Sequence, residues 1–237
     1  LPVGAGLSSS AALEVAVALA LGFEGSALDL ARVTQLAEQQ ASGVPCGIMD
    51  QLASAGGVTG HALLIDCHEL TVTPVALPDD IEIRVVHSGQ ARKLAGSAYA
   101  ERTAAVAAAE EHLGPLRLLR DPAAADALDD PVLRRRARHV ISENERVRTV
   151  VAALAAGDRD AVGRALVASH VSLRDDFEVS TPVLDTLVDR LNATDGVIGA
   201  RLTGAGFGGC VVALAEPGAL DEGWLVVPSD GARLLAP

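Results

Sequence analysis

A run of glycines and serines near the start of the sequence has the composition of an anion-binding loop. Gly4 to Ser10 reads Gly-Ala-Gly-Leu-Ser-Ser-Ser and leads into an apolar segment that we expect to be helical. Glycines allow a ligand to approach the backbone, and the free N–H groups and the dipole at a helix N-terminus attract negative charge. Lys93 is the only lysine and lies far away in sequence, so this is not a Walker A loop. The pattern indicates a polyphosphate held by backbone amides; the alternative is an ordinary helix start capped by serine.

A second glycine-rich loop, Gly204-Ala205-Gly206-Phe207-Gly208-Gly209, lies near the other end of the sequence. Its spacing partly matches a dinucleotide-binding fingerprint, but that fingerprint requires a helix after the loop, whereas residues 210–214 have the composition of a strand. We therefore reject a Rossmann fold. We expect these glycines to let the backbone pack against another loop or a flat group, and a plain hairpin turn is the alternative.

Two carboxylates are candidates for chemistry because of their places on expected helices. Asp50 lies just inside a helix that begins after residues 45–47, where the helix dipole favours an ionised carboxylate that can accept a hydrogen bond from a substrate hydroxyl. Glu38 lies near the end of its helix, where the dipole disfavours negative charge and a bound cation would stabilise it. The alternatives are a helix cap for Asp50 and a solvated surface residue for Glu38.

These residues are positioned by a mixture of helices and strands. The segment 15–21, with serines before it and Gly22 after it, is apolar on all sides, so we expect a buried helix with serine caps. The next helix follows Ser26, and Leu36 is among the apolar residues on one side of it. Residues 121–130 are expected to form an exposed connector. We expect helices at 15–21, 28–40, 48–54, 91–112, 131–156, 159–170 and 181–191, and strands at 61–66, 71–75, 81–87, 197–202, 210–214 and 225–227.

The composition excludes several classes of protein. The chain has 237 residues, 49% hydrophobic and 21% charged, which is enough for a packed core in one large domain or two small ones. Its longest apolar runs, 15–21 and 150–156, are far shorter than the roughly 20 residues of a membrane span. The net charge of −12 disfavours nucleic-acid partners. The 3 cysteines are widely spaced and fit neither a disulfide framework nor a zinc site, so we expect a cytoplasmic protein.

Three stretches together resemble the GHMP kinase superfamily. Residues 1–12 look like its phosphate-binding motif, residues 43–51 resemble specifically the galactokinase branch, and residues 201–210 are similar to the C-terminal motif of that branch. Segments 139–146 and 169–177 are supporting matches. The resemblance implies a two-domain α+β GHMP kinase fold. Residues 1–78 would be a remnant of the ribosomal S5 domain 2-like N-terminal domain, and residues 79–237 a ferredoxin-like, helix-rich C-terminal domain, with nucleotide and sugar in the cleft between them.

The resemblance also implies a reaction and its residues. Galactokinases transfer the γ-phosphoryl group of Mg-ATP to the anomeric hydroxyl of galactose, so the implied cofactors and substrates are ATP, Mg²⁺ and galactose. Asp50 would be catalytic, and Ser10 and Glu38 would hold the magnesium ion. The nucleotide would contact Gly4, Gly6, Leu7, Ser8, Ser9, Ser10 and Ala11, and the sugar would contact Cys46, Gly47, Asp50, Tyr99, Gly204 and Gly206. We expect no nucleic-acid or membrane partner, and a monomer or weak homo-oligomer.

The sequence departs from the family pattern in two places. No segment matches the first family motif, which carries most sugar-contacting residues and an arginine that stabilises the transferring phosphate. We therefore expect this chain alone to bind galactose weakly and not to turn over. If residues 1–237 are the entire polypeptide, we also expect an exposed strand edge and apolar face. Residues 216–222 are too few for the helix usually found there, so we expect a shortened or rearranged end of the second domain.

Three alternatives to a galactokinase remain at this point. A GHMP kinase for a related sugar or for mevalonate would share the phosphate loop, although residues 46–51 argue against it. A galactose- and ATP-sensing module without catalytic activity could share the fold, although Asp50 and the intact triple serine argue mildly against it. A nonfunctional remnant is compatible with the sequence.

Overall fold

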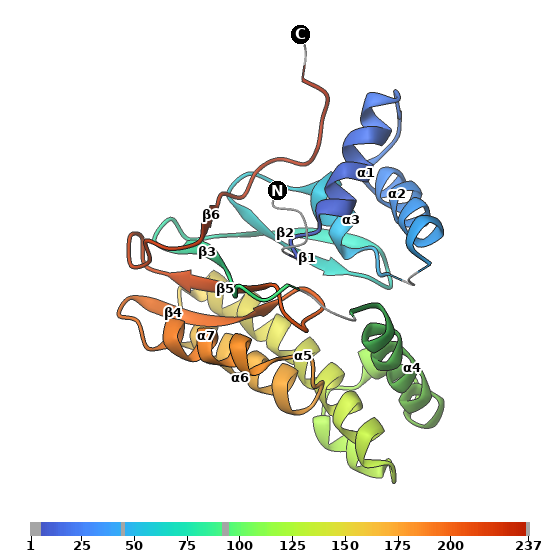
Figure 1. The fold of residues 1–237 in the computed structure, drawn as a ribbon, viewed down its shortest axis with the longest axis vertical. Helices are drawn as coiled ribbons and strands as arrows, with labels where there is room; N and C mark the ends of the chain where they lie inside the picture. Colours follow the sequence, from blue (N-terminus) through green and yellow to red (C-terminus); the bar gives the residue numbers. More distant parts are fainter. Residues whose placement is uncertain (1–5, 44–45, 92–94, 236–237) are drawn as a thin grey trace. The chain divides into compact units, whose positions relative to one another are not determined.

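The computed structural model describes residues 6–43, 46–91 and 95–235 (Figure 1). The backbone contacts divide the chain into two compact units. The first unit comprises residues 1–77 and 227–237, and the second comprises residues 78–226. The domain boundary expected after residue 78 stays a prediction, and the compact units differ from it in placing residues 227–237 with the first unit.

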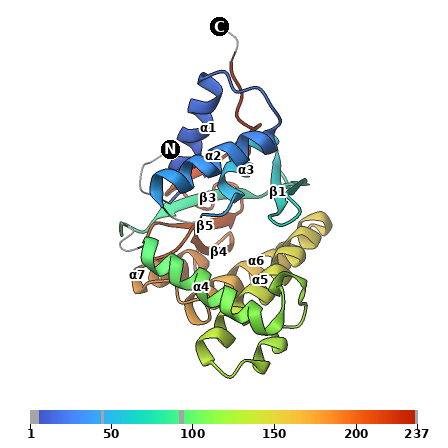
Figure 2. The ribbon, with the colours of Figure 1, turned by 90° about the vertical axis from the view of Figure 1, so that its right-hand side faces the viewer.

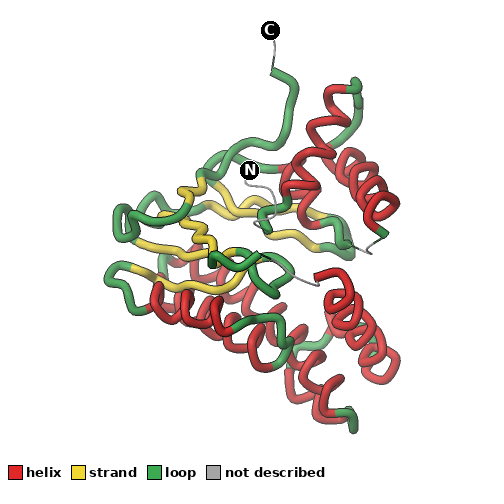
Figure 3. Tube along the Cα trace, in the orientation of Figure 1, coloured by secondary structure: helices red, strands yellow, loops and turns green. Residues whose placement is uncertain are grey.

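In its described residues the first unit combines three helices with a β-hairpin (Figures 1 and 3). Its elements are α1 (Ser9–Ala20), α2 (Ala27–Ser42), α3 (Met49–Gly56), β1 (His61–Asp66) and β2 (Thr71–Ala76). The two strands pair antiparallel, from His61 opposite Ala76 to Asp66 opposite Thr71. Each strand has one unpaired edge within the described part of the chain. Both strands are close to their predicted positions.

Local sequence signals determine the limits of α2. Ser26 and Asp29 form a capping box at its N-terminus, where each side chain accepts a hydrogen bond from the backbone amide of the other residue. Gly43 ends the helix in the left-handed conformation with φ of 69°. Ala31 of α2 packs with Ile48 and Leu52 in one buried cluster, which joins α2 to α3.

The expected burial of the first helix is wrong. It starts at Ser9, earlier than predicted, and only Ala11 and Val15 are buried. Leu13 and Val17, in the same helix, are 65% and 47% exposed. Leu36 of α2, expected on the apolar side of its helix, is 55% exposed. An apolar composition on every side does not determine which side meets a neighbour, because that depends on the elements packed against it.

The second unit is a four-stranded antiparallel sheet with helices. The sheet order is β4-β5-β3-β6, and Figure 2 shows α5 and α6 side by side. The elements are β3 (Glu82–His87), α4 (Ala95–Leu113), α5 (Pro131–Ala156), α6 (Arg159–Asp175), α7 (Pro182–Asn192), β4 (Val197–Thr203), β5 (Cys210–Ala215) and β6 (Trp224–Val226). The α+β fold class is thereby confirmed. The residues between β5 and β6 form no helix. None of the described helices is long and apolar enough to cross a membrane.

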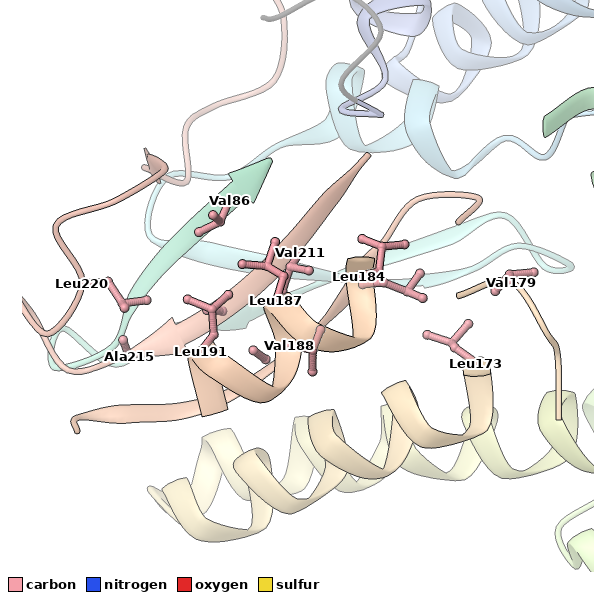
Figure 4. Packing of buried hydrophobic residues seen from close by; sticks show 13 residues of the cluster. Val86, Leu173, Val179, Leu184, Leu187, Val188, Leu191, Val211, Ala215 and Leu220 are labelled. Atoms are coloured by element: carbon pink, nitrogen blue, oxygen red, sulfur yellow. The ribbon is translucent and has the colours of Figure 1, made fainter. Parts of the chain in front are cut away.

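The core of the second unit lies between α7 and the sheet (Figure 4). Leu184, Leu187, Val188 and Leu191 repeat at helical spacing on α7 and pack in the same cluster as Val211 of β5. The helix starts where expected, because the Thr181 side chain accepts a hydrogen bond from Leu184 N and Pro182 occupies the first turn.

Helix α6 approaches β4 very closely. A Cβ atom at Gly163 of α6 would overlap the carbonyl oxygen of Ile198, and a Cβ atom at Gly199 of β4 would lie 2.9 Å from the Cα atom of Gly163. Glycine at both positions therefore permits direct contact between the helix and strand backbones.

The expected exposed connector is also wrong in part. Residues Pro122–Ala127 form a 3₁₀-helix whose N-cap residue is Asp121, and the Asp121 side chain accepts a hydrogen bond from Ala123 N. Ala125 and Leu128 are 0% and 4% exposed and pack with Ile141 of α5. Small apolar residues between the acids allow this segment to cover the end of a helix pair.

Candidate active site

The N-terminus of α1 presents backbone amides at the serine run. Gly6 and Ser8 have φ values of 81° and 52°, so the chain turns through left-handed conformations before the helix begins. Ser8 is the N-cap residue, but its side chain makes no capping hydrogen bond. The first intrahelical bond runs from Ala12 N to Ser8 O, 3.1 Å, so the amides of residues 9–11 precede it. The expected serine cap is contradicted, and a first turn without acidic residues can face an anion.

Glu38 of α2 lies at the centre of a polar cluster that joins the three helices of the first unit. Ser10 Oγ donates a hydrogen bond to Glu38 Oε1 at 2.7 Å, and Gln51 Nε2 donates to Glu38 Oε2 at 2.5 Å. Glu14 lies one turn after Ser10 on α1, and burial together with the nearby charge of Glu38 raises the pKa of its carboxyl group. Within the described residues, Glu14 Oε2 is buried without a hydrogen-bond partner.

The oxygen donors of this cluster fit a magnesium ion. Mg²⁺ in nucleotide sites is usually bound through one or two carboxylates and substrate phosphates, and it keeps several waters. Glu38, Glu14 and the hydroxyl of Ser10 are donors of that kind. Residues 6–43, 46–91 and 95–235 contain no group of three or more His, Cys, Asp or Glu that could hold a metal by themselves, so the phosphates would complete the ligand set.

Asp50 is the second residue of α3 and is half-buried. No side chain caps this helix, since Ile48 is at the N-cap position, so its dipole acts on Asp50 without a competing cap. Among the residues that the structure describes, none forms a hydrogen bond or an ion pair with the Asp50 carboxylate. Gly47, just before the helix, is exposed, and a Cβ atom there would meet open space. The carboxylate is therefore available to accept a hydrogen bond from a ligand hydroxyl.

Cys46 lies against α2 beside Glu38. Its carbonyl oxygen accepts hydrogen bonds from Gln35 Nε2 at 3.0 Å and from Gln39 Nε2 at 2.9 Å. Burial, and then the charge of Glu38, raise the pKa of the Cys46 thiol, so the thiol is a poor nucleophile. Cys46 can contact a ligand, but its thiol is not set up for covalent chemistry.

The glycine-rich loop of the second unit is a hairpin between β4 and β5, and Thr203 pairs with Cys210 at its base. Five of its six residues have positive φ values: Gly204, Gly206, Phe207, Gly208 and Gly209. A Cβ atom at Gly206 would overlap the carbonyl oxygen of Val179, and one at Gly208 would lie 2.9 Å from the carbonyl oxygen of Gln90. The hairpin and the packing against another loop, weighed as alternatives from the sequence, are thus both present.

The segment 176–179 supports this hairpin and is held by arginines. Phe207 N donates to Val179 O at 2.8 Å, and the Arg102 guanidinium lies 5.9 Å from the centre of the Phe207 ring. Arg102 Nε also donates to Phe177 O at 2.7 Å. Arg102 is on α4, three residues after Tyr99, so both lie on one side of that helix. The hairpin and the helix that carries Tyr99 therefore share one support.

The expected site residues fall into two groups. Gly6, Leu7, Ser8, Ser9, Ser10, Ala11, Glu38, Cys46, Gly47 and Asp50 lie in the first unit, and Tyr99, Gly204 and Gly206 lie in the second. Gly4 lies outside the described residues. The structure brings Ser10, Glu38 and Cys46 together in the first unit, and the roles assigned to all these residues stay predictions.

Sequence reasoning missed two side chains of the polar cluster, Glu14 and Gln51, and one that supports the glycine-rich hairpin, Arg102. Glu14 follows Ser10 by four residues, a spacing that places both on one helix face and could have identified it. Gln51 follows Asp50 directly, but only the packing of α3 on α2 reveals its contact with Glu38. Arg102 gave no signal in the sequence, because its partners are backbone carbonyls far along the chain.

Two family descriptions match the chain: GHMP kinases N terminal domain over residues 1–57 and GHMP kinases C terminal over residues 150–232. The chain is 48% identical over 233 residues to the galactokinase of Chloroflexus aurantiacus, covering 93% of this chain and 60% of that protein. It is 49% identical over 231 residues to the galactokinase of Roseiflexus sp., covering 91% of this chain and 58% of that protein. The chain thus spans about three fifths of the length of these relatives.

Solved structures give the same assignment. The crystal structure of Lactococcus lactis galactokinase complexed with galactose matches with a TM-score of 0.91 and 32% identity, covering 99% of this chain and 69% of that one. The crystal structure of L. major mevalonate kinase in complex with R-mevalonate matches with a TM-score of 0.60 and 19% identity, over 97% and 67% of the two chains, which shows a shared fold. The chain belongs to the GHMP kinases and, within them, to the galactokinase family.

Proposed function

We propose that the protein transfers the γ-phosphoryl group of ATP to the anomeric hydroxyl of galactose and releases galactose 1-phosphate and ADP. The relatives named galactokinase, and the related structure complexed with galactose, support a kinase reaction with galactose as the acceptor. The observation that carries the proposal is the arrangement in the first unit. There the uncapped start of α1, the Ser10–Glu38 contact and Asp50 belong to three helices packed on one another.

The start of α1 would bind the nucleotide phosphates. The amides of residues 9–11 and the positive end of the helix dipole attract phosphate oxygens, and Gly6 permits a left-handed turn in front of them. Ser10 and Glu38 would hold Mg²⁺, which when bound neutralises charge on the phosphates. Phosphoryl transfer depends mainly on position and on charge stabilisation, so backbone amides without a lysine can serve.

Asp50 would act on the acceptor sugar. Its carboxylate has no partner among the described residues, so it can accept the hydrogen bond of the anomeric hydroxyl and take its proton as the phosphoryl group is transferred. Cys46 and Gly47 precede it and would contact the sugar from the same segment. Tyr99, Gly204 and Gly206 of the second unit are proposed as further sugar contacts on the strength of the family resemblance.

Chain 1–237 alone is expected to bind galactose weakly and not to turn over, because no segment of it matches the first family motif. Cys46, Cys67 and Cys210 form no disulfide, which agrees with the cytoplasmic location expected from the sequence. A monomeric or weakly oligomeric state likewise stays a prediction.

The test combines nucleotide binding with turnover. Chain 1–237 should bind a nonhydrolysable ATP analogue in the presence of Mg²⁺, as measured by calorimetry. The native protein, with its length established by intact-mass measurement, should release ADP in a galactose-dependent manner. The substitution Asp50→Asn should lower kcat by about 10²- to 10⁴-fold, the contribution of a general base.

Asp79→Asn is the matched control, because Asp79 is exposed and carries no role in the proposal. Its kcat should equal that of the wild type. Nucleotide binding without galactose-dependent ADP release would contradict the kinase proposal and favour a sensing module. Faster turnover of another sugar would contradict the substrate assignment.

A further inference from the structure

One face of α2 holds the segment that leads to Asp50. Gln35, Glu38 and Gln39 have the three- and four-residue spacing of a single helix face. The amides of Gln35 and Gln39 both donate to the carbonyl oxygen of Cys46, at 3.0 and 2.9 Å. A carbonyl oxygen has two lone pairs, so these two amides satisfy it completely. This end of the segment is therefore held by two bonds to the same atom.

The other end of the segment is held by Gln51. Its side chain is 0% exposed, and Nε2 donates to Glu38 Oε2. A carboxylate only accepts hydrogen bonds, so the NH₂ end of the amide must face Glu38. Within the described residues Gln51 Oε1 is buried without a hydrogen-bond partner, so the bond from Nε2 to Glu38 offsets part of the cost of burying this amide and ties α3 to α2. Asp50 lies between these two attachment points.

We propose that Gln35, Gln39 and Gln51 are positioning residues that clamp the segment Cys46–Gln51 onto α2 and thereby fix the Asp50 carboxylate relative to Glu38. The inference rests on the proposed roles of Asp50 and Glu38, and it adds the groups that set the distance between them. The reason such a clamp matters is geometric, because a shift of about 1 Å in a reacting group can lower a rate about 100-fold.

The position of the segment can be measured without any activity. Cys46 is half-buried, Cys67 is exposed and neither forms a disulfide, so alkylation of these two thiols by iodoacetamide can be followed by peptide mass spectrometry on chain 1–237. The variant Gln35→Met/Gln39→Met loses both hydrogen bonds to Cys46 O and should alkylate at Cys46 about tenfold faster than wild type. Each single variant should change the rate by less than about threefold, because the remaining amide still holds the carbonyl oxygen.

Gln40→Met is the matched control, since Gln40 is an exposed residue of the same helix. Its alkylation rates at Cys46 and Cys67 should equal those of the wild type. Amide hydrogen exchange in β1 separates release of the segment from unfolding of the first unit, and should stay unchanged in the double variant. An unchanged rate at Cys46, or a rise in β1 exchange parallel to it, would overturn the clamp.

Kinetics of the native protein give a second, independent measurement. Gln51→Met, which adds no charge beside Glu38, should lower kcat for galactose by about 10- to 100-fold while the KM for ATP stays the same. Equal losses in kcat and in the affinity for ATP would indicate a general structural role and contradict the proposal. If the wild-type protein does not phosphorylate galactose, the proposed function fails, whereas the alkylation rates still decide the clamp.

Discussion

The substitution Gly206→Ala tests why the hairpin between β4 and β5 is rich in glycine. Gly206 has φ of 79°, and its added Cβ would lie 2.7 Å from the Cβ atom of Val179 and would overlap the Val179 carbonyl oxygen. Gly218 is the matched control, because it has φ of 80° in the same unit and a Cβ atom there would have no neighbour within 4 Å. Both substitutions introduce backbone strain, but only Gly206→Ala also forces two loops apart.

The expected costs follow from these contacts. A left-handed conformation costs a residue with a Cβ atom about 1–2 kcal/mol, which is the whole effect expected for Gly218→Ala. Gly206→Ala adds about 1–3 kcal/mol for overpacking. It also loses the bond from Phe207 N to Val179 O, worth about 0.5–1.5 kcal/mol. The total is about 3–6 kcal/mol, a large part of the stability of an ordinary domain.

The free energy of unfolding can be measured by urea denaturation followed through the fluorescence of Trp224. This is the only tryptophan of the chain and lies in β6, so the signal reports on the second unit. Gly206→Ala should be the less stable variant by about 2–4 kcal/mol. Equal stabilities of the two variants would show that the glycine is required only for its backbone conformation, and would refute the packing argument.

Two further predictions concern the second unit. In Gly163→Ala the Cβ atom would overlap Ile198 O, so we expect destabilisation of about 1–3 kcal/mol although alanine is the better helix former. The exposed Val167→Ala on the same helix should be neutral or slightly stabilising, and a Gly163→Ala variant as stable as wild type would contradict the close packing. Burial, which outweighs the attraction of Glu143, lowers the pKa of His139 from 6.5 to about 4. Neutral His139 therefore makes its full contribution to the free energy of unfolding above pH 6.5. This contribution decreases as the pH falls towards 4, by about 3 kcal/mol in all. Between pH 7.5 and pH 5, urea denaturation should show a smaller loss of unfolding free energy in His139→Gln than in wild type. Equal losses would refute this assignment. The pKa of His170 is also lowered mainly by burial, but its contribution is the same in both proteins.

The sequence predicted the elements whose limits are set by neighbouring residues. The two ends of α2 are formed by local contacts of Ser26, Asp29 and Gly43. The helix could therefore be placed from the residues that flank it in the sequence. The glycines at 204–209 likewise indicated close backbone approach, but not that Val179 and Gln90 are the partners. Those partners come from distant parts of the chain, which spacing does not reveal.

The candidate site was predictable to the same extent. Ser10, Glu38 and Asp50 were proposed through the family resemblance, and the structure brings Ser10 and Glu38 into contact. Gln51 was missed, because a buried amide between two helices looks like any surface glutamine in the sequence. The exposure of Leu13 on α1 was missed for a related reason: burial depends on which elements surround a helix rather than on its own residues.

The return of residues 227–235 to the first unit has a consequence for synthesis on the ribosome. Thr59 N and Oγ1 donate to Asp230 Oδ1, Gly231 N donates to Gly57 O, and a Cβ atom at Gly57 would lie 2.6 Å from Ser229 O. A nascent chain emerges in sequence order, so residues 78–226 are complete before these bonds can form. Although its helices are translated before the second unit, the first unit can be completed only after that unit, and until then the loop after α3 lacks its hydrogen-bond partners from residues 230–231.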